Sequence, residues 1–231
     1  MKPFHFKQFS IQQSKKVFRV GTDGVLLGAA STVNNAKNIL EVGTGTGLIS
    51  LMLAQRNPEA DIHAIDINEN AVELAVENFE NSPFRNRLKV FLQDYKNFNS
   101  KEKYDLIVSN PPYFEENGSQ KDITARQQTE LSFGFLVDKS LDLLSEKGFL
   151  SVIIPFDSGV LFEEYCFKKS LYLHNKIQIC GIKNSKPKRL ILEFGFHKKE
   201  TNESELVIEK SPRKYTDEYL KLTEEFHQFS K

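Results

Sequence analysis

Residues 39–50 read Ile39-Leu40-Glu41-Val42-Gly43-Thr44-Gly45-Thr46-Gly47-Leu48-Ile49-Ser50, and they are the strongest indication of the fold class in the chain. An apolar run enters a loop with glycine at every second position, and a helical pattern follows. Glycine tolerates positive φ angles and lets the backbone approach a ligand closely. The dinucleotide fingerprint G-x-G-x-x-G would need glycine at position 48, where this chain has leucine. The stretch therefore predicts a strand, a ligand-binding loop at Gly43, Gly45 and Gly47, and a helix.

Acidic residues precede this loop and end the next two predicted strands. Glu41 lies two residues before Gly43 and could accept hydrogen bonds from a cationic group of the ligand. Asp66 ends a strand 19 residues after Gly47, where an acid in a doubly wound fold can hold two ribose hydroxyls. Asp94 ends the following strand and could accept a hydrogen bond from an adenine amino group. Asp66 and Asp94 could each be a helix N-cap instead.

A fourth predicted strand runs into the turn Asn110-Pro111-Pro112-Tyr113. The prolines remove two backbone N–H donors and restrict φ. The Asn110 side-chain oxygen and the Pro111 backbone carbonyl can then accept both hydrogens of a planar amino group, and Tyr113 offers a face for stacking. A plain strand-ending turn is the alternative, because paired prolines often mark turns. The turn therefore indicates a site that grips a flat amine.

Together these residues resemble the class I S-adenosylmethionine-dependent methyltransferases. The Asn-Pro-Pro-Tyr turn is similar to that of the amino-methyltransferases, which modify adenine N6, cytosine N4 or glutamine N5. Residues 4–11, 20–29, 124–126 and 215–219 are similar to the bacterial tRNA1(Val) adenine-37 N6-methyltransferases. At position 127 this chain has Gln127, where members of that family often have His or Tyr.

The resemblance implies direct methyl transfer from S-adenosylmethionine to N6 of an adenine in a tRNA anticodon loop, with adenine 37 of tRNA1(Val) as the first choice. The implied cofactor-binding residues are Glu41, Gly43, Gly45, Gly47, Asp66 and Asp94, and the implied catalytic residues are Asn110, Pro111, Pro112 and Tyr113. Another RNA or DNA amino-methyltransferase stays an alternative. A protein glutamine N5-methyltransferase is disfavoured, because only 38 residues precede Ile39. A non-catalytic RNA-binding scaffold is the alternative outside catalysis.

The predicted fold class is α/β, with a doubly wound, mostly parallel seven-stranded sheet and an antiparallel edge strand, because strands and helices alternate. Strands are expected near residues 38–42, 61–66, 88–94, 104–109, 148–155, 175–182 and 189–198. Helices are expected near residues 24–31, 46–56, 69–80, 129–146, 157–170 and 215–229, with Asp23 as the N-cap of the first. We expect an N-terminal extension over 1–36, a methyltransferase domain over 37–198, and a polar mobile connector with a final helix over 199–231.

The formal net charge is zero, but the charges are segregated along the chain. Residues 57–84 hold seven acids and no Lys or Arg, whereas residues 165–192 hold seven bases and no acid. In the predicted fold these segments lie at opposite edges of the sheet. The basic segment could hold an RNA backbone through Lys183, Lys186, Lys188 and Arg189. Ordinary solvated lysines are the alternative.

Other features narrow the class of protein. The five histidines are scattered and the two cysteines lack paired spacing, so neither a metal site nor a disulfide framework is expected. No apolar run approaches the roughly 18 residues of a membrane span. The first residues lack the basic-then-apolar order of a signal peptide. We therefore expect a cytoplasmic monomer that acts on tRNA.

Overall fold

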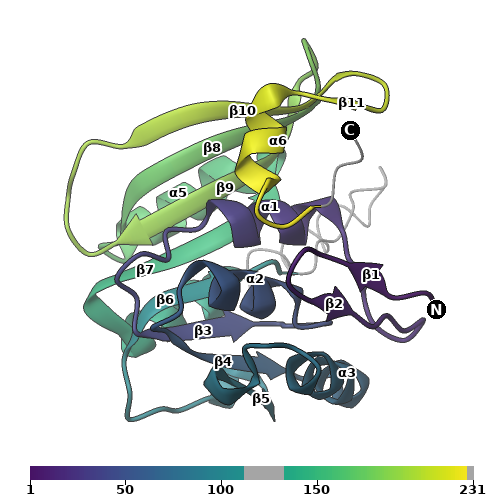
Figure 1. The fold of residues 1–231 in the computed structure, drawn as a ribbon. Helices are drawn as coiled ribbons and strands as arrows, with labels where there is room; N and C mark the ends of the chain where they lie inside the picture. Colours follow the sequence, from purple (N-terminus) through teal and green to yellow (C-terminus); the bar gives the residue numbers. More distant parts are fainter. Residues whose placement is uncertain (112–132, 228–231) are drawn as a thin grey trace, which may run out of the picture.

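The computed structural model describes residues 1–111 and 133–227, and its centre is a nine-stranded sheet with the order β11-β10-β8-β9-β7-β6-β3-β4-β5 (Figure 1). The strands are β3 (Asn38–Val42), β4 (Asp61–Asp66), β5 (Leu88–Leu92), β6 (Tyr104–Ser109), β7 (Leu144–Pro155), β8 (Tyr172–Ile182), β9 (Pro187–Gly195), β10 (Asn202–Ser211) and β11 (Lys214–Tyr215). A separate hairpin near the N-terminus pairs β1 (Phe4–His5) with β2 (Ser10–Ile11).

Helices cover both faces of the sheet. The helices are α1 (Thr22–Ala30), α2 (Leu48–Arg56), α3 (Glu69–Glu80), a helix over residues 133–143, α5 (Gly159–Lys168) and α6 (Asp217–Thr223), with short 3-10 turns η1 (Arg85–Arg87), η2 (Tyr95–Asn97) and η3 (Phe156–Ser158). Successive side chains of a strand point to opposite faces, so Ile39 packs in one core and Leu40 in the other. The first core lies beneath α1, α2, α3 and α6, and the second beneath residues 133–143 and α5. The doubly wound α/β prediction is therefore confirmed, but the predicted count of seven strands is wrong, because β10 and β11 extend the sheet to nine.

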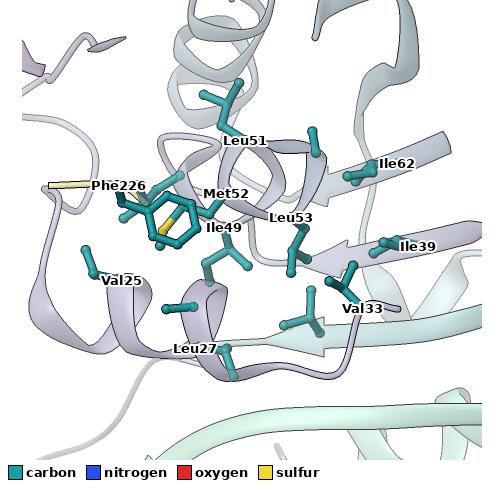
Figure 2. Packing of buried hydrophobic residues seen from close by; sticks show 14 of the residues in the cluster. Val25, Leu27, Val33, Ile39, Ile49, Leu51, Met52, Leu53, Ile62 and Phe226 are labelled. Carbon is teal, nitrogen blue, oxygen red and sulfur yellow. The ribbon is translucent and has the colours of Figure 1, made fainter. Parts of the chain in front are cut away.

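The first core is closed by the contact of α1 with α2. Figure 2 shows its apolar side chains, with Phe226 from the C-terminal end joining Met52 of α2 in the same cluster. A Cβ on Gly28 of α1 would lie 2.8 Å from the Met52 sulfur, so only glycine allows the two helices to come this close. This packing fixes α2, and with it the loop that precedes α2.

The predicted helix 69–80 is confirmed as α3, with Asn68 as its N-cap. The prediction that Asp23 caps the first helix is wrong. Gly21 is the N-cap of α1, and Asp23 sits in the first turn, where its Oδ2 accepts a hydrogen bond from Arg189 Nε at 2.9 Å. A partner 166 positions away in the chain replaces the local cap.

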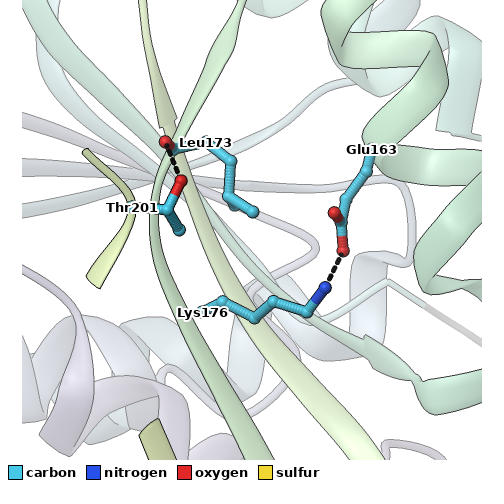
Figure 3. Close-up of polar contacts among 4 residues, drawn as sticks. All are labelled: Glu163, Leu173, Lys176 and Thr201. Atoms are coloured by element: carbon cyan, nitrogen blue, oxygen red, sulfur yellow. Dashed lines mark hydrogen bonds and ion pairs between the residues drawn. The ribbon is translucent and has the colours of Figure 1, made fainter. Parts of the chain in front are cut away.

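The prediction of a mobile connector over residues 199–212 is also wrong, because these residues enter the sheet as β10. This strand pairs with β8 in parallel from Asn202 to Glu209. Its start is fixed by Thr201, whose hydroxyl donates to the Leu173 carbonyl at 3.1 Å (Figure 3). The last two predicted strands, near residues 175–182 and 189–198, form the antiparallel pair β8 and β9, but this pair lies inside the sheet and not at its edge. The edge strand is β11, which is antiparallel to β10.

Candidate functional site

The predicted site residues gather where the parallel strands β3, β4, β5 and β6 end. These four strands are neighbours in the sheet and point the same way. Their ends bring the loop at Gly43, the carboxylates of Asp66 and Asp94, and the side chain of Asn110 to one edge, here called the carboxyl edge. Ligands of open α/β sheets bind at such an edge. The fold therefore brings together on one edge residues that lie between positions 43 and 110 of the sequence.

The glycine loop is held in a conformation that only glycine adopts readily. Gly43, Gly45 and Gly47 have φ angles of 75°, 56° and 78°. The backbone amides of Gly43 and Thr44 donate to the Ile65 carbonyl at 2.9 and 3.1 Å, and the Gly45 amide donates to Asp66 Oδ2 at 2.9 Å. The loop is thus tied to the end of β4 before any ligand binds.

Helix α3 packs directly on this loop. A Cβ on Gly47 would lie 2.5 Å from Phe79 Cε1, which leaves no room for a side chain. The neighbouring Asn78 is 1% exposed, and its Nδ2 donates to the Thr46 carbonyl at 2.9 Å. The loop is therefore clamped between β4 and α3.

The buried carboxylate of Glu41 holds the glycine loop in place through hydrogen bonds. It is 1% exposed, and its Oε2 accepts hydrogen bonds from Thr44 Oγ1 at 2.8 Å, from the Ser50 amide at 3.0 Å and from Ser50 Oγ. These bonds join the end of β3 to the start of α2. Burial raises the pKa of Glu41 to about 7, although the hydrogen bonds from Ser50 and Thr44 oppose this rise. Its predicted contact with the cofactor stays a prediction.

The raised pKa of Glu41 predicts a stability that depends on pH. Because the folded protein holds this proton more tightly than the unfolded chain, the contribution of Glu41 is fully present below its usual pKa of 4.5 and is lost as the pH rises through 7. Relative to the Glu41→Gln variant, the wild type should lose about 2–3 kcal/mol of unfolding free energy between about pH 5 and pH 8, measured by urea denaturation. The exposed Glu80→Gln variant should follow the wild type at every pH. A difference between wild type and Glu41→Gln that does not change with pH would contradict the assignment.

The two strand-end acids have different surroundings. Asp66 is half-buried, and its Oδ1 and Oδ2 accept from the amides of Asn68 and Gly45, both at 2.9 Å. Each carboxylate oxygen has two lone pairs, so both can accept a further hydrogen bond. Asp94 is exposed, and its Oδ1 accepts from the Lys96 amide at 2.9 Å as the N-cap of η2. Capping and ligand binding are compatible at both positions.

Two apolar side chains beside these acids escaped the sequence analysis. Ile67 follows Asp66 directly and is 74% exposed, and Leu92 pairs with Asp66 across the two strands and is 53% exposed. Large apolar side chains at this exposure form a surface from which a flat ring would displace water. The signal in the sequence is an apolar residue next to a strand-ending acid.

Asn110, at the end of β6, lies beside the glycine loop. Val42 at the end of β3 pairs with Ser109 at the end of β6, and Ser109 Oγ donates to the Val42 carbonyl at 2.9 Å. Asn110 is half-buried and Pro111 is buried. The rest of the predicted turn, Pro112 and Tyr113, lies outside the described residues, as do residues 124–127.

The basic segment meets the same edge through a hairpin turn. Strand β8 runs parallel to β6 and β7, so the turn after it reaches the carboxyl edge. Lys183 and Lys186 lie in this turn and Lys188 lies at the start of β9, and all three are exposed. Arg189 instead forms an ion pair with Asp23 in the first turn of α1.

Other bases of the segment are paired with acids. Lys176 lies 2.7 Å from Glu163 of α5 (Figure 3), and Lys169 lies 2.8 Å from Asp138. The acidic segment, in contrast, forms β4 and α3 near the other end of the sheet. The two segments therefore lie in opposite halves of the sheet, but neither forms its edge, and β10 with Glu203, Glu205 and Glu209 lies outside β8.

A second basic turn, missed in the sequence, lies next to the first. The Lys183 amide donates to the Glu209 carbonyl at 2.9 Å, which places the β10–β11 turn beside the β8–β9 turn. Arg213 lies in the second turn and Lys214 at the start of β11, and both are exposed. The short apolar run Leu206-Val207-Ile208, rich in β-branched residues, was the available signal for a strand that leads to this turn.

Within residues 1–111 and 133–227, no three His, Cys, Asp or Glu side chains gather as metal ligands. In the same residues, no helix combines the length and the apolar character needed to span a membrane.

Comparisons with known proteins agree with this geometry. Residues 13–156 match the family model of the methyltransferase small domain. A curated relative from Flavobacteriaceae bacterium (strain 3519-10), named tRNA1(Val) (adenine(37)-N6)-methyltransferase, is 55% identical over 230 residues, which cover 99% of this chain and 100% of the relative.

Solved structures share the fold. A predicted O-methyltransferase from Agrobacterium tumefaciens has a TM-score of 0.68 at 16% identity, over 88% of this chain and 96% of its own. N-methyltransferase NodS from Bradyrhizobium japonicum WM9, in complex with S-adenosyl-L-homocysteine, has a TM-score of 0.54 at 19% identity, over 73% of this chain and 82% of its own. At these identities the likeness concerns the fold alone, which is that of the class I methyltransferases.

Proposed function

The chain belongs to the methyltransferase small domain family and, within it, to the tRNA1(Val) (adenine(37)-N6)-methyltransferases. We therefore propose that it methylates N6 of adenine 37 in tRNA1(Val), with S-adenosylmethionine as the methyl donor. One observation of the site carries the proposal. The Asn110 turn, suited to a flat amine, ends the strand next to the one that enters the glycine loop. A donor held by that loop and an amine held by Asn110 would therefore be neighbours.

The residues of the carboxyl edge fit S-adenosylmethionine. A Cβ on Gly43 would meet nothing within 4 Å, so open space lies over the loop. Asp66 has lone pairs left for ribose hydroxyls, and Asp94 is exposed for an adenine amino group. Ile67 and Leu92 supply apolar surface for the adenine ring. S-adenosylmethionine brings a methyl group made electrophilic by its sulfonium, so no covalent enzyme intermediate is needed.

The residues of the protein must make the adenine amino group a better nucleophile. The lone pair of an exocyclic adenine nitrogen is delocalised into the ring, which makes it a poor nucleophile. We assign to the Asn110 side-chain oxygen and the Pro111 carbonyl the two hydrogen bonds that draw this nitrogen toward a tetrahedral shape, and to Pro112 and Tyr113 the rigidity of the turn and the stacking of the base. This is catalysis by positioning and electrostatic stabilisation.

The substrate must offer its base outside a helix. An anticodon loop does so at little cost, because its bases are not held in a duplex. Lys183, Lys186, Lys188 and Arg189, together with Arg213 and Lys214 of the neighbouring turn, are proposed to hold its phosphates. In this proposal the protein acts as a monomer in the cytoplasm.

The function is tested on tRNA from cells that lack this protein. Purified enzyme and S-adenosylmethionine should produce N6-methyladenosine at position 37 of tRNA1(Val), detected by nucleoside mass spectrometry after isolation of that tRNA. Methyl transfer to glutamine of a protein, or to another RNA or DNA, would replace the proposal by one of its alternatives. Absence of S-adenosylmethionine binding in calorimetry would favour a non-catalytic scaffold.

The basic turn predicts a change in RNA affinity that depends on salt. The variant with Lys183, Lys186 and Lys188 changed to alanine should raise KM for tRNA about tenfold or more, with kcat at saturating tRNA unchanged. The slope of log affinity against log salt should become shallower by about 2, since each lost phosphate contact removes roughly 0.7–0.9. Arg189 is left in place, because its ion pair with Asp23 also holds α1.

A matched variant controls for the loss of three charges. Lys37, Lys101 and Lys147 are exposed and lie before or early in β3, β6 and β7, at the opposite edge of the sheet. Their change to alanine should leave both KM and the salt slope near the wild-type values. Equal effects of the two variants would show a general charge effect and would remove the RNA-binding role from the turn.

A further inference from the structure

The loop between β2 and α1, residues 12–20, is held firmly against the cofactor side of the carboxyl edge. Its first residue, Gln12, exchanges hydrogen bonds with Asn78 of α3: the Gln12 amide donates to Asn78 Oδ1 at 2.7 Å, and Asn78 Nδ2 donates to the Gln12 carbonyl at 3.2 Å. The same Asn78 amide group also holds Thr46 of the glycine loop. One buried side chain thus links the N-terminal loop to the glycine loop.

The middle of the N-terminal loop is anchored by Val17. This residue is 8% exposed and packs with Ala71 and Leu74 of α3. Its Cγ1 would lie 4.0 Å from a Cβ on Gly45, so it also borders the glycine loop. The loop backbone therefore runs along the edge of the cofactor site.

The anchoring of Val17 leaves its neighbour Phe18 in water. Phe18 is 86% exposed, more than any other large apolar side chain among the described residues. Such exposure forgoes the gain that burial of an aromatic ring would bring. Val17 is packed on one side of Phe18, and on the other side the Val20 amide donates to Gln13 Oε1 at 3.3 Å. The exposed ring therefore belongs to the folded structure and is available to a partner.

The charge around Phe18 indicates the chemistry of that partner. Lys15, Lys16 and Arg19 are exposed, and none of them makes an ion pair within residues 1–111 and 133–227. Residues 1–22 contain five Lys or Arg and no Asp or Glu. An aromatic face among cations matches a single nucleic acid strand, in which flat bases alternate with phosphates.

We propose that Phe18 is a stacking platform for a base of the substrate RNA, with Lys15, Lys16 and Arg19 contacting the adjoining phosphates. This inference rests on the RNA methylation proposed above and adds a second contact region to it. The RNA would be held on both sides of Asn110, by the N-terminal loop on the glycine-loop side and by the two basic turns on the other. The stacked base would be one other than the base that receives the methyl group.

The absence of tryptophan from the chain allows a direct test. The Phe18→Trp variant carries a single tryptophan, at a position where the ring can still stack. Its fluorescence should be quenched on titration with tRNA1(Val) transcript, because a nucleobase would cover the indole. S-adenosylhomocysteine alone should leave the fluorescence unchanged.

The matched control is Phe167→Trp. Phe167 is 65% exposed at the end of α5 and contacts Tyr172 at the start of β8, on the side opposite the carboxyl edge. The single tryptophan of this variant should show no quenching by tRNA. Quenching of both variants, or of neither, would overturn the platform, and quenching of Phe18→Trp by S-adenosylhomocysteine alone would place Phe18 over the cofactor instead.

Kinetics separate this inference from the proposed function. Phe18→Ala should raise KM for tRNA by about tenfold while kcat and KM for S-adenosylmethionine stay unchanged, and Phe18→Tyr should restore KM. If wild type methylates tRNA and Phe18→Ala matches it, the platform is wrong and the function stands. If wild type fails to methylate tRNA, the proposed function itself is wrong.

Discussion

Asn110→Ala is expected to lower kcat for tRNA methylation by about 100- to 1000-fold, the usual loss when one preorganised hydrogen-bonding group at the reacting centre is removed. The side-chain oxygen is one of two acceptors assigned to the amino group, and the Pro111 carbonyl cannot orient the nitrogen alone. The measurement is single-turnover methylation with saturating tRNA and S-adenosylmethionine, so that binding does not limit the rate.

The structure limits what else this change can do. Asn110 lies beyond the end of β6, whereas the glycine loop is fixed by Glu41, Asp66 and Asn78. Calorimetry should therefore find S-adenosylmethionine bound with an affinity within about threefold of wild type, or about 0.6 kcal/mol. A kcat within a few fold of wild type would remove Asn110 from the catalytic role.

Gly47→Ala should destabilise the protein by about 2–5 kcal/mol. About 1–2 kcal/mol comes from forcing a side chain into the left-handed region at a φ of 78°. A further 1–3 kcal/mol comes from the contact of the new Cβ with the Phe79 ring, which would lie 2.5 Å away in a packed core. Urea denaturation monitored by circular dichroism measures the loss.

Gly43→Ala is the matched control for this prediction. Its φ is similar, at 75°, but the new Cβ would meet nothing within 4 Å. We expect a loss of only about 1–2 kcal/mol from the backbone, with weaker binding of S-adenosylmethionine because the methyl enters the open space over the loop. Equal losses of unfolding free energy for the two variants would mean that the Phe79 ring moves to accommodate the new Cβ, and that its packing does not restrict the glycine loop.

Much of the site could be predicted because its signals are local. The glycine spacing from Gly43 to Gly47, the strand-ending Asp66 and the Asn110 turn each lie within a few residues of the strand that presents them. Parallel strands then bring these ends together, since neighbouring parallel strands finish at the same edge. For such features, the order of the strands along the chain is enough to predict which residues meet at the carboxyl edge.

The features that escaped depend on contacts between distant residues. Strand β10 begins with the polar run Asn202-Glu203-Ser204-Glu205, which resembles a linker until β8 offers its backbone for pairing. Asp23 has the local signature of a cap, but Arg189 reaches it from β9. Phe18 looks like any core phenylalanine in the sequence, and only the burial of Val17 leaves it outside.

The hydrogen bonds of Asn78 have a consequence for the thermodynamics of RNA recognition. Because the same amide holds Gln12 and Thr46, the N-terminal loop is ordered together with the glycine loop when the protein folds. Its conformational entropy is lost at that step, so RNA meets a preorganised surface and little ordering remains to oppose binding. The RNA, and not the protein, would then have to change conformation on binding. Discrimination between substrates would depend on the free energy that each RNA loop needs to adopt the bound conformation.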